Sequence, residues 1–179
     1  RQALGSIPGW FVAGHPIAGT EQSGVEASFS DLYTGRRVIL TPTAETQPAA
    51  VKKVRAMWEA AGASVNEMNV QHHDEVLAAT SHLPHMLAFA LVESLARMSE
   101  KREIFEYAAG GFRDFTRIAS SDPVMWRDIC LANRDALLTM VEIFRGDLDD
   151  LTSAIRDQDA GRVLRIFQDA KAARDAFAG

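Results

Sequence analysis

The sequence predicts a mainly α-helical fold in which an all-helical segment follows the last strands of a truncated, Rossmann-like α/β layer. Up to Met68, short β-type runs alternate with turns, whereas every periodic segment after Met68 has the three- and four-residue spacing of a helix. The front section offers three strand candidates and one helix, and a single helix cannot cover both faces of a parallel sheet. We therefore expect a domain boundary between residues 68 and 69, with the rest of the α/β layer encoded upstream of Arg1.

The front section predicts a strand–helix–strand unit. Strand candidates cover residues 10–13, 37–41 and 64–68, and the helix lies between the last two. Pro48 fits the first turn of this helix, apolar residues recur at three- and four-residue steps, and Gly62 is a typical stop. Such a unit normally forms two parallel strands joined by a right-handed crossover.

The remainder predicts a series of helices. The first covers residues 70–80, and we expect Pro84 to bend or restart it because proline lacks a backbone donor. Residues 86–98 are apolar on nearly every face, which is typical of a helix enclosed on all sides. Ser121-Asp122-Pro123 predicts a strong helix start. The helix that follows carries an apolar seam suited to partner helices, formed by Leu137, Val141, Phe144, Leu148, Leu151 and Ile155.

The composition excludes several classes of protein. The formal charge of -5, from 24 acidic and 19 basic residues, argues against general binding to nucleic acid or to an anionic membrane surface. The single cysteine, Cys130, excludes an internal disulfide framework and is consistent with a reducing cytoplasm. We find neither an apolar stretch of membrane-spanning length nor a secretory signal, and we expect a cytoplasmic protein.

The first candidate site is the stretch from Gly14 to Glu21, which directly follows a strand candidate. Open α/β sheets bind ligands where the carboxyl ends of parallel strands meet, and glycines let the backbone approach a ligand closely. His15 is therefore a candidate general base. The alternative is that His15 only terminates a strand.

The second candidate is Ser81-His82-Leu83-Pro84-His85, in which the two histidines share one helical face. They are candidates for contact with an anionic ligand, for a metal site, or for a structural role. His72, His73, Asp74 and Glu75 lie too far along the axis to complete a metal site, and we interpret residues 72–75 as a solvated helix surface.

The third candidate runs from Gly110 to Arg117. The glycine pair opens a helix whose free N–H groups favour an anion, and Arg113 and Arg117 stand one turn apart. Arginine binds carboxylates with two parallel hydrogen bonds, so this element suits a carboxylated substrate. The alternative is an Asp114–Arg117 pair that lies on the surface without function.

Three stretches together resemble prephenate dehydrogenases and their arogenate dehydrogenase relatives. They are GHPIAGTEQSG at residues 14–24, SHLPHMLAFA at 81–90 and GGFRDFTRIASSDPVMWRD at 110–128, and the resemblance extends over nearly the whole chain. The resemblance implies oxidation of prephenate, or arogenate, with NAD or NADP, loss of carbon dioxide, and a 4-hydroxyphenyl product in tyrosine biosynthesis.

The resemblance also implies roles for individual residues. It makes His15 the catalytic histidine, which polarises or deprotonates the ring hydroxyl, and Arg117 the cation that binds the ring carboxylate. It places Ser81, His82 and His85 around the substrate pocket, and it matches gating or lining positions to Thr20, Glu21, Asp114 and Trp126.

The chain departs from the family because it has no G-x-G-x-x-G motif. We therefore expect residues 1–68 to be the carboxy-terminal remnant of a dinucleotide-binding domain, and residues 69–179 to bind substrate and to form a homodimer. The chain alone is expected to bind NAD(P) poorly and to be inactive. Two other classes remain open, namely a non-catalytic helical dimerisation or ligand-sensing module and a metal-dependent hydrolase.

Overall fold

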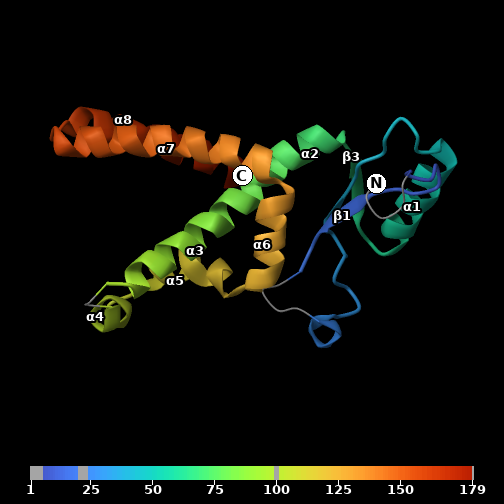
Figure 1. The fold of residues 1–179 in the computed structure, drawn as a ribbon, viewed down its shortest axis with the longest axis horizontal. Coiled ribbons are helices and arrows are strands. Elements are labelled where there is room, and N and C mark those ends of the chain that lie inside the picture. The colour runs from blue at the N-terminus through green and yellow to red at the C-terminus, as the bar shows by residue number, and fades with distance from the viewer. Residues whose placement is uncertain (1–5, 20–23, 99–100, 179) are drawn as a thin grey trace. The chain divides into compact units, whose positions relative to one another are not determined.

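The structure, a computed structural model, describes residues 6–19, 24–98 and 101–178. It divides into two compact units, Arg1–Leu137 and Leu138–Gly179, which are described separately below. Within the first unit a small three-stranded sheet precedes a set of helices (Figure 1), and the second unit is helical. The mainly helical fold with a small sheet at its amino-terminal side is therefore confirmed.

The sheet has the strand order β1-β2-β3, and its members are β1 (Gly14–Ile17), β2 (Arg37–Leu40) and β3 (Ser64–Glu67). β2 and β3 are parallel, and α1 (Pro48–Ala60) forms the crossover between them, as the strand–helix–strand pattern predicts. The core under α1 is formed by Val38, Leu40 and Ala63, with Val51, Val54 and Trp58 of the helix packed against it. The glycine expected to end the helix, Gly62, has a φ of 84°, which only glycine adopts at low cost.

The strand predicted over residues 10–13 is wrong in position. Trp10 and Phe11 belong to a turn in which the Phe11 N–H donates to the carbonyl of Pro8 at 2.9 Å, and the strand begins at Gly14. It pairs antiparallel with β2, with His15 opposite Ile39. His15 therefore lies within an outer strand of the sheet, not on a loop after a parallel strand. Pro16 is tolerated there because an outer strand does not need every N–H for pairing.

Pro84 does not restart the long helix that follows the sheet. α2 (Val70–Leu77), the π-helical turn η2 (Ala78–His82) and α3 (Leu83–Ala96) form one continuous run. In η2 the Leu83 N–H donates to the carbonyl of Ala78, five residues back, and this wider turn comes just before the proline. A π-turn of this kind often marks a functional site.

The continuous helix Val70–Ala96 is long and apolar enough to cross a membrane by length and composition alone. The expectation that no stretch reaches that length is therefore wrong. Core helices of soluble proteins pass the same test. This helix carries His73 and His82 and packs against α5 (Gly110–Thr116) and η3 (Arg117–Ser120), so we interpret it as the central helix of the first unit.

α3 is less enclosed within this chain than the sequence predicts. Of its residues only Leu83 and Ala88 are buried, and the other large apolar side chains are half-buried. The sequence predicts a helix enclosed on all sides, and among the described residues of this single chain the enclosure of α3 is only partial. Part of the apolar surface of α3 therefore remains accessible in the single chain.

Asp122 begins α6 (Pro123–Ala132) as predicted, because its carboxylate accepts the N–H groups of Val124 and Met125 at 2.7 and 3.1 Å. The long helix expected after it is interrupted at Asn133, and α7 (Arg134–Arg156) follows. A short helix, α4 (Lys101–Glu106), precedes α5. The remaining elements are the 3-10 turn η1 (Val25–Ala27) and the last helix, α8 (Ala160–Ala178).

The second unit is a hairpin of α7 and α8. The chain reverses at Gln158, whose φ is 54°, and an ion pair between Arg162 and Asp150 links the two helices. Ala154 is buried between them. The hairpin also exposes large apolar residues to solvent. About half of the surface of each is exposed at Leu138, Ile143, Leu148, Ile155, Leu164 and Phe167.

Candidate active site

The strand β1 brings His15 against the first turns of α2. The Nδ1 atom of His15 lies 2.9 Å from Nε2 of His73, and the two ring centroids are 5.2 Å apart. His73 in turn lies 2.8 Å, through Nδ1, from a carboxylate oxygen of Asp74. The interpretation of residues 72–75 as a solvated surface is therefore wrong for His73, whose side chain is 17% exposed, whereas His72 and Glu75 are exposed and the Asp74 side chain is 44% exposed.

His82 lies on the π-turn and is the most enclosed histidine, with 8% of its surface exposed. The side-chain amide nitrogen of Asn133 lies 3.1 Å from His82 Nδ1 and also donates to the carbonyl of Asp74 at 2.8 Å. An amide nitrogen is a donor only, so Nδ1 of His82 accepts and its proton resides on Nε2. His82 therefore offers a hydrogen-bond donor.

His85 has the opposite arrangement. Its Nδ1 lies 2.8 Å from the carbonyl of Ser81, which only accepts, so Nδ1 carries the proton and Nε2 keeps its lone pair. The imidazole is stacked on the indole of Trp126, with ring centroids 3.6 Å apart and planes 17° apart. His82 and His85 thus present one donor and one acceptor from the same helical run.

Burial keeps these imidazoles neutral near pH 7. Desolvation lowers the pKa of His15, and the charge of His73 lowers it further. Desolvation is also the main cause that lowers the pKa of His82, followed by the charges of His15 and His73, with Asp74 opposing. The pKa of His85 is lowered by desolvation, against the hydrogen bond to Ser81. A neutral imidazole is the form that can accept a proton.

We expect the protein to lose stability in acid for the same reason. The unfolded chain protonates these three histidines near their ordinary pKa of 6.5, whereas the folded chain does so only at lower pH. Because the unfolded state then binds more protons, the free energy of unfolding falls as the pH drops below about 6.5. Thermal melts at a series of pH values check this. In His85→Gln the melting temperature should fall less steeply as the pH drops. A melting temperature that stays constant from pH 8 to 5.5 would contradict it.

Trp126 is 8% exposed, and its buried indole Nε1 has no hydrogen-bond partner among the described residues. A buried donor left unpaired costs about 1–3 kcal/mol, so a ligand that supplies an acceptor there relieves part of that cost. Trp126 also borders an apolar hollow of about 200 Å³ between α3 and α6, together with Met86, Phe89, Pro123, Arg127 and Cys130. The indole is thus a candidate ligand contact.

Arg117 begins η3, one turn after Arg113 on α5, and its side chain is exposed. α5 and η3 both pack against α3, the helix that carries His85. Asp114 is exposed on α5. Thr20 and Glu21 lie outside the described residues. The structure thus brings His15, Ser81, His82, His85 and Trp126 into one region, and it places Arg117 and Asp114 on elements that pack against the same helix.

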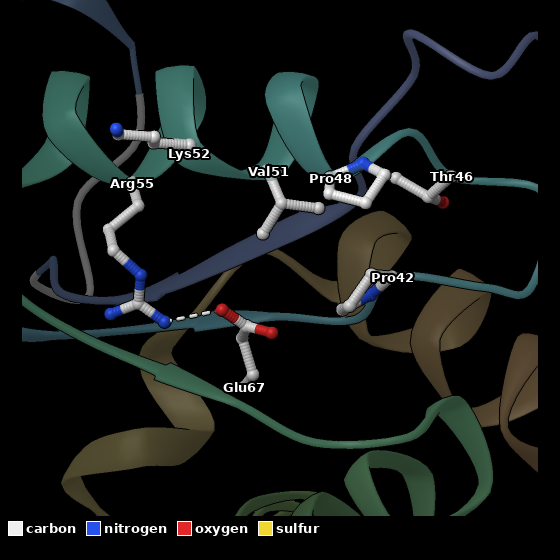
Figure 2. Close-up of a pocket in the computed structure, with 7 residues that line it drawn as sticks. All are labelled: Pro42, Thr46, Pro48, Val51, Lys52, Arg55 and Glu67. Atoms are coloured by element: carbon white, nitrogen blue, oxygen red, sulfur yellow. Dashed lines mark hydrogen bonds and ion pairs between the residues drawn. The ribbon is translucent and has the colours of Figure 1, made fainter.

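A separate hollow of about 430 Å³ opens between α1 and the ends of β2 and β3 (Figure 2). Arg55 crosses it, donating to the carbonyl of Val65 at 2.8 Å and to the carboxylate of Glu67. The neighbouring carboxylate of Glu67 raises the pKa of Arg55. These bonds tie α1 to β3, so we assign Arg55 a structural role. The predicted site residues do not line this hollow.

No group of three or more histidine, cysteine or acidic side chains is placed to hold a metal ion in the part of the chain that the structure describes. The two residues that sequence reasoning missed are His73 and Asn133. His73 was identifiable only through the contact of β1 with α2, and Asn133 only through its hydrogen bonds to His82 and to the carbonyl of Asp74.

The chain thus combines a strand–helix–strand sheet with a helical part, and neutral imidazoles cluster where the two meet. The chain belongs to the prephenate dehydrogenase family. Residues 69–169 match the family model described as prephenate dehydrogenase, dimerization domain, and residues 2–67 match the model described as prephenate dehydrogenase, nucleotide-binding domain.

Relatives of known name agree with this membership. A cyclohexadienyl dehydrogenase of Zymomonas mobilis is 43% identical over 168 residues, which cover 93% of this chain and 57% of the relative. A prephenate dehydrogenase of Bacillus subtilis is 39% identical, with 93% of this chain and 45% of the relative covered. The chain thus spans about half the length of these relatives.

Solved structures show the same similarity. The Aquifex aeolicus prephenate dehydrogenase in complex with hydroxyphenyl propionate and NAD+ has a TM-score of 0.87 and 45% identity, covering 93% of this chain and 59% of that one. The Synechocystis arogenate dehydrogenase has a TM-score of 0.81 and 29% identity, covering 93% and 61%.

Proposed function

We propose that this chain is the substrate-binding and subunit-pairing part of a prephenate or arogenate dehydrogenase. The net reaction converts prephenate and NAD(P)+ to 4-hydroxyphenylpyruvate, carbon dioxide and NAD(P)H. One observation carries the proposal: side chains from three distant motifs gather around one run of helix. His15 comes from the first motif, His82 and His85 from the second, and Trp126 from the third.

His15 acts on the ring hydroxyl of the substrate. As a neutral imidazole it accepts the hydroxyl proton while the carbon that bears the hydroxyl loses its hydride. Loss of the ring carboxylate as carbon dioxide then leaves its electron pair in the ring, which becomes aromatic, and His15 returns the proton to the oxygen. The step needs no net proton from the protein, and aromatisation makes it downhill.

Arg117 orients the substrate by binding its ring carboxylate. Holding the reacting carbon in place relative to His15 can account for much of the rate. The substrate then loses its translational and rotational freedom on binding, before the chemical step begins. The contact must not stabilise the ionised carboxylate too strongly, since that group leaves as carbon dioxide. The donors at Trp126 Nε1 and His82 Nε2 complete the polar lining, with Thr20, Glu21, Asp114 and Ser81 as further lining or gating positions.

The residues of this chain do not by themselves fit the dinucleotide. The pyrophosphate of NAD(P) binds at a glycine-rich loop that opens a helix, and α1 begins at Gln47-Pro48 instead. We propose that residues 1–68 are the carboxy-terminal remnant of the dinucleotide-binding domain and residues 69–179 the substrate and dimerisation domain. The remainder of the dinucleotide site belongs to a full-length parent enzyme, which we place in the cytoplasm.

The proposed activity is tested by assaying the full-length parent for NAD(P)H formation with prephenate and with arogenate. We expect reduction of the cofactor with one of these substrates, accompanied by an equal amount of carbon dioxide. If neither substrate supports reduction, but calorimetry shows binding of 4-hydroxyphenylpyruvate that depends on Arg117, the chain is a ligand-sensing module and the catalytic proposal fails.

We propose further that two copies pair through their helical parts. The family model over residues 69–169 is described as a dimerization domain. On the hairpin of α7 and α8, Leu148 and Ile155 belong to the apolar seam that the sequence predicts, and they are 48% and 59% exposed. A second copy is the occupant that this seam suits, because a two-fold pair places the same apolar patch on both sides.

Leu148→Glu should weaken this pairing. In a two-fold dimer the substitution occurs twice, so we expect the dimer dissociation constant to rise by about 10²- to 10³-fold. Gly146→Glu is the matched control, since it adds the same charge two residues away on the opposite face of the helix, where a Cβ meets nothing within 4 Å. Analytical ultracentrifugation measures both constants. Equal dissociation constants for the two variants would show that the seam is not part of the dimer interface.

A further inference from the structure

His15, the proposed base, is connected through His73 to the carboxylate of Asp74, and the three side chains form a row. Nδ1 of His15 lies 2.9 Å from Nε2 of His73, and Nδ1 of His73 lies 2.8 Å from Oδ1 of Asp74. The side chain of His73 is 17% exposed and that of Asp74 is 44% exposed, so the row leads from the site to solvent.

The chemistry of this row allows only one placement of protons when both imidazoles are neutral. An ionised carboxylate only accepts, so the proton of His73 must be on Nδ1, facing Asp74. Nε2 of His73 is then an acceptor. Nδ1 of His15 must in turn carry a proton and donate it to that acceptor, which leaves the lone pair of His15 on Nε2.

We propose that His73 and Asp74 are positioning residues that hold His15 in the tautomer with its proton on Nδ1, so that Nε2 is the basic nitrogen. This inference rests on the proposed function, since the tautomer matters only if His15 accepts a proton. A free histidine side chain favours the other tautomer, with the proton on Nε2. Without His73, most His15 side chains would present a donor where the reaction needs an acceptor.

The surrounding structure fixes His73 in place. The side chain of Asn69 caps α2 by accepting the His72 N–H at 2.8 Å, and the His73 N–H donates to the carbonyl of Asn69 at 3.0 Å. Asn133 donates to the carbonyl of Asp74 at 2.8 Å. Both members of the pair thus lie on a backbone that is held at two points. The same row also strengthens after proton transfer, because a protonated His15 donates to His73 through a charge-assisted bond.

The inference is tested in two ways. The first is nitrogen NMR of ¹⁵N-histidine-labelled chain near pH 8, with the His15 signals identified by their loss in His15→Asn. We expect His15 to carry its proton on Nδ1 in the unsubstituted chain and in His73→Gln, whose amide oxygen still accepts. We expect the Nε2-protonated form to dominate in His73→Phe, which keeps the ring but lacks an acceptor. His72→Phe, an exposed neighbour on the same helical turn, should leave the His15 tautomer unchanged.

The second test is kinetic and uses the full-length parent. His73→Phe should lower kcat by about 10- to 100-fold with KM within about threefold, and His73→Gln should recover most of the loss. The kcat of Asp74→Asn should lie between those of His73→Phe and His73→Gln. An amide can either accept a hydrogen bond from Nδ1 of His73 or donate one to it, so it allows both tautomers of His73. The inference is overturned if His73→Phe leaves the His15 tautomer unchanged, or leaves kcat within twofold.

The two tests separate this inference from the proposed function. If His15→Asn retains full turnover, the base assignment fails, whatever the NMR signals of His15 show. If His15→Asn abolishes turnover while His73→Phe changes neither tautomer nor kcat, the base assignment stands and the positioning role of His73 fails.

Discussion

Replacing His15 by asparagine in the full-length parent is expected to lower kcat by about 10²- to 10⁴-fold, the usual contribution of a general base. Asparagine keeps the polar character and can still bond to His73, but it cannot accept the hydroxyl proton. The dissociation constant of the substrate should therefore stay within about threefold, since binding depends on other groups. Steady-state kinetics and calorimetry measure the two quantities.

The pH dependence provides an internal check on the same assignment. Burial lowers the pKa of His15, so the base remains active to below pH 6.5, and kcat/KM should fall only as the pH drops further. That acidic limb should be absent from the residual activity of His15→Asn. His72→Asn, at an exposed position of α2, is the control and should keep both the rate and the limb. An unchanged rate in His15→Asn would defeat the assignment of the base.

Arg117→Ala is expected to weaken substrate binding by about 10- to 100-fold. The expectation follows from the loss of a hydrogen-bonded pair with a carboxylate, which typically contributes 1.5–3 kcal/mol, or about one to two powers of ten. Turnover at saturating substrate should change less than affinity does. Calorimetry with prephenate measures the dissociation constant directly.

Arg97→Ala serves as the control for Arg117. Arg97 is exposed at the end of α3 and pairs with Glu93 at 2.7 Å, so its removal deletes an equal charge from a position that we assign no ligand role. Its dissociation constant for the substrate should match that of the unsubstituted enzyme. If both variants bind equally well, Arg117 does not hold the carboxylate.

Local patterns in the sequence predicted much of the fold. The crossover helix is identifiable from Pro48 and Gly62, and the start of α6 from Asp122, because each of these residues acts on its own immediate backbone. The parallel pairing of β2 and β3 follows from the crossover between them. Such features need only a few neighbouring residues, and those residues are adjacent in the sequence.

Other features depend on contacts between distant residues. The position of β1 was missed because Trp10 and Phe11 have strand-like composition, yet the pairing with β2 begins at Gly14. The π-turn before Pro84 and the break at Asn133 depend on how the helices pack against each other. His73 entered the site only once β1 lay against α2, so the sequence motif alone suggested an exposed surface.

The central claim is that His15 and Arg117 contact the same substrate molecule, and a crystal structure of the His15→Asn parent with NAD+ and prephenate tests it most directly. This variant should bind the substrate without consuming it. We predict that the ring hydroxyl lies within hydrogen-bond distance of residue 15 while the guanidinium of Arg117 binds the ring carboxylate. A bound prephenate whose ring carboxylate contacts a different cation, with Arg117 turned away from the site, would contradict the account.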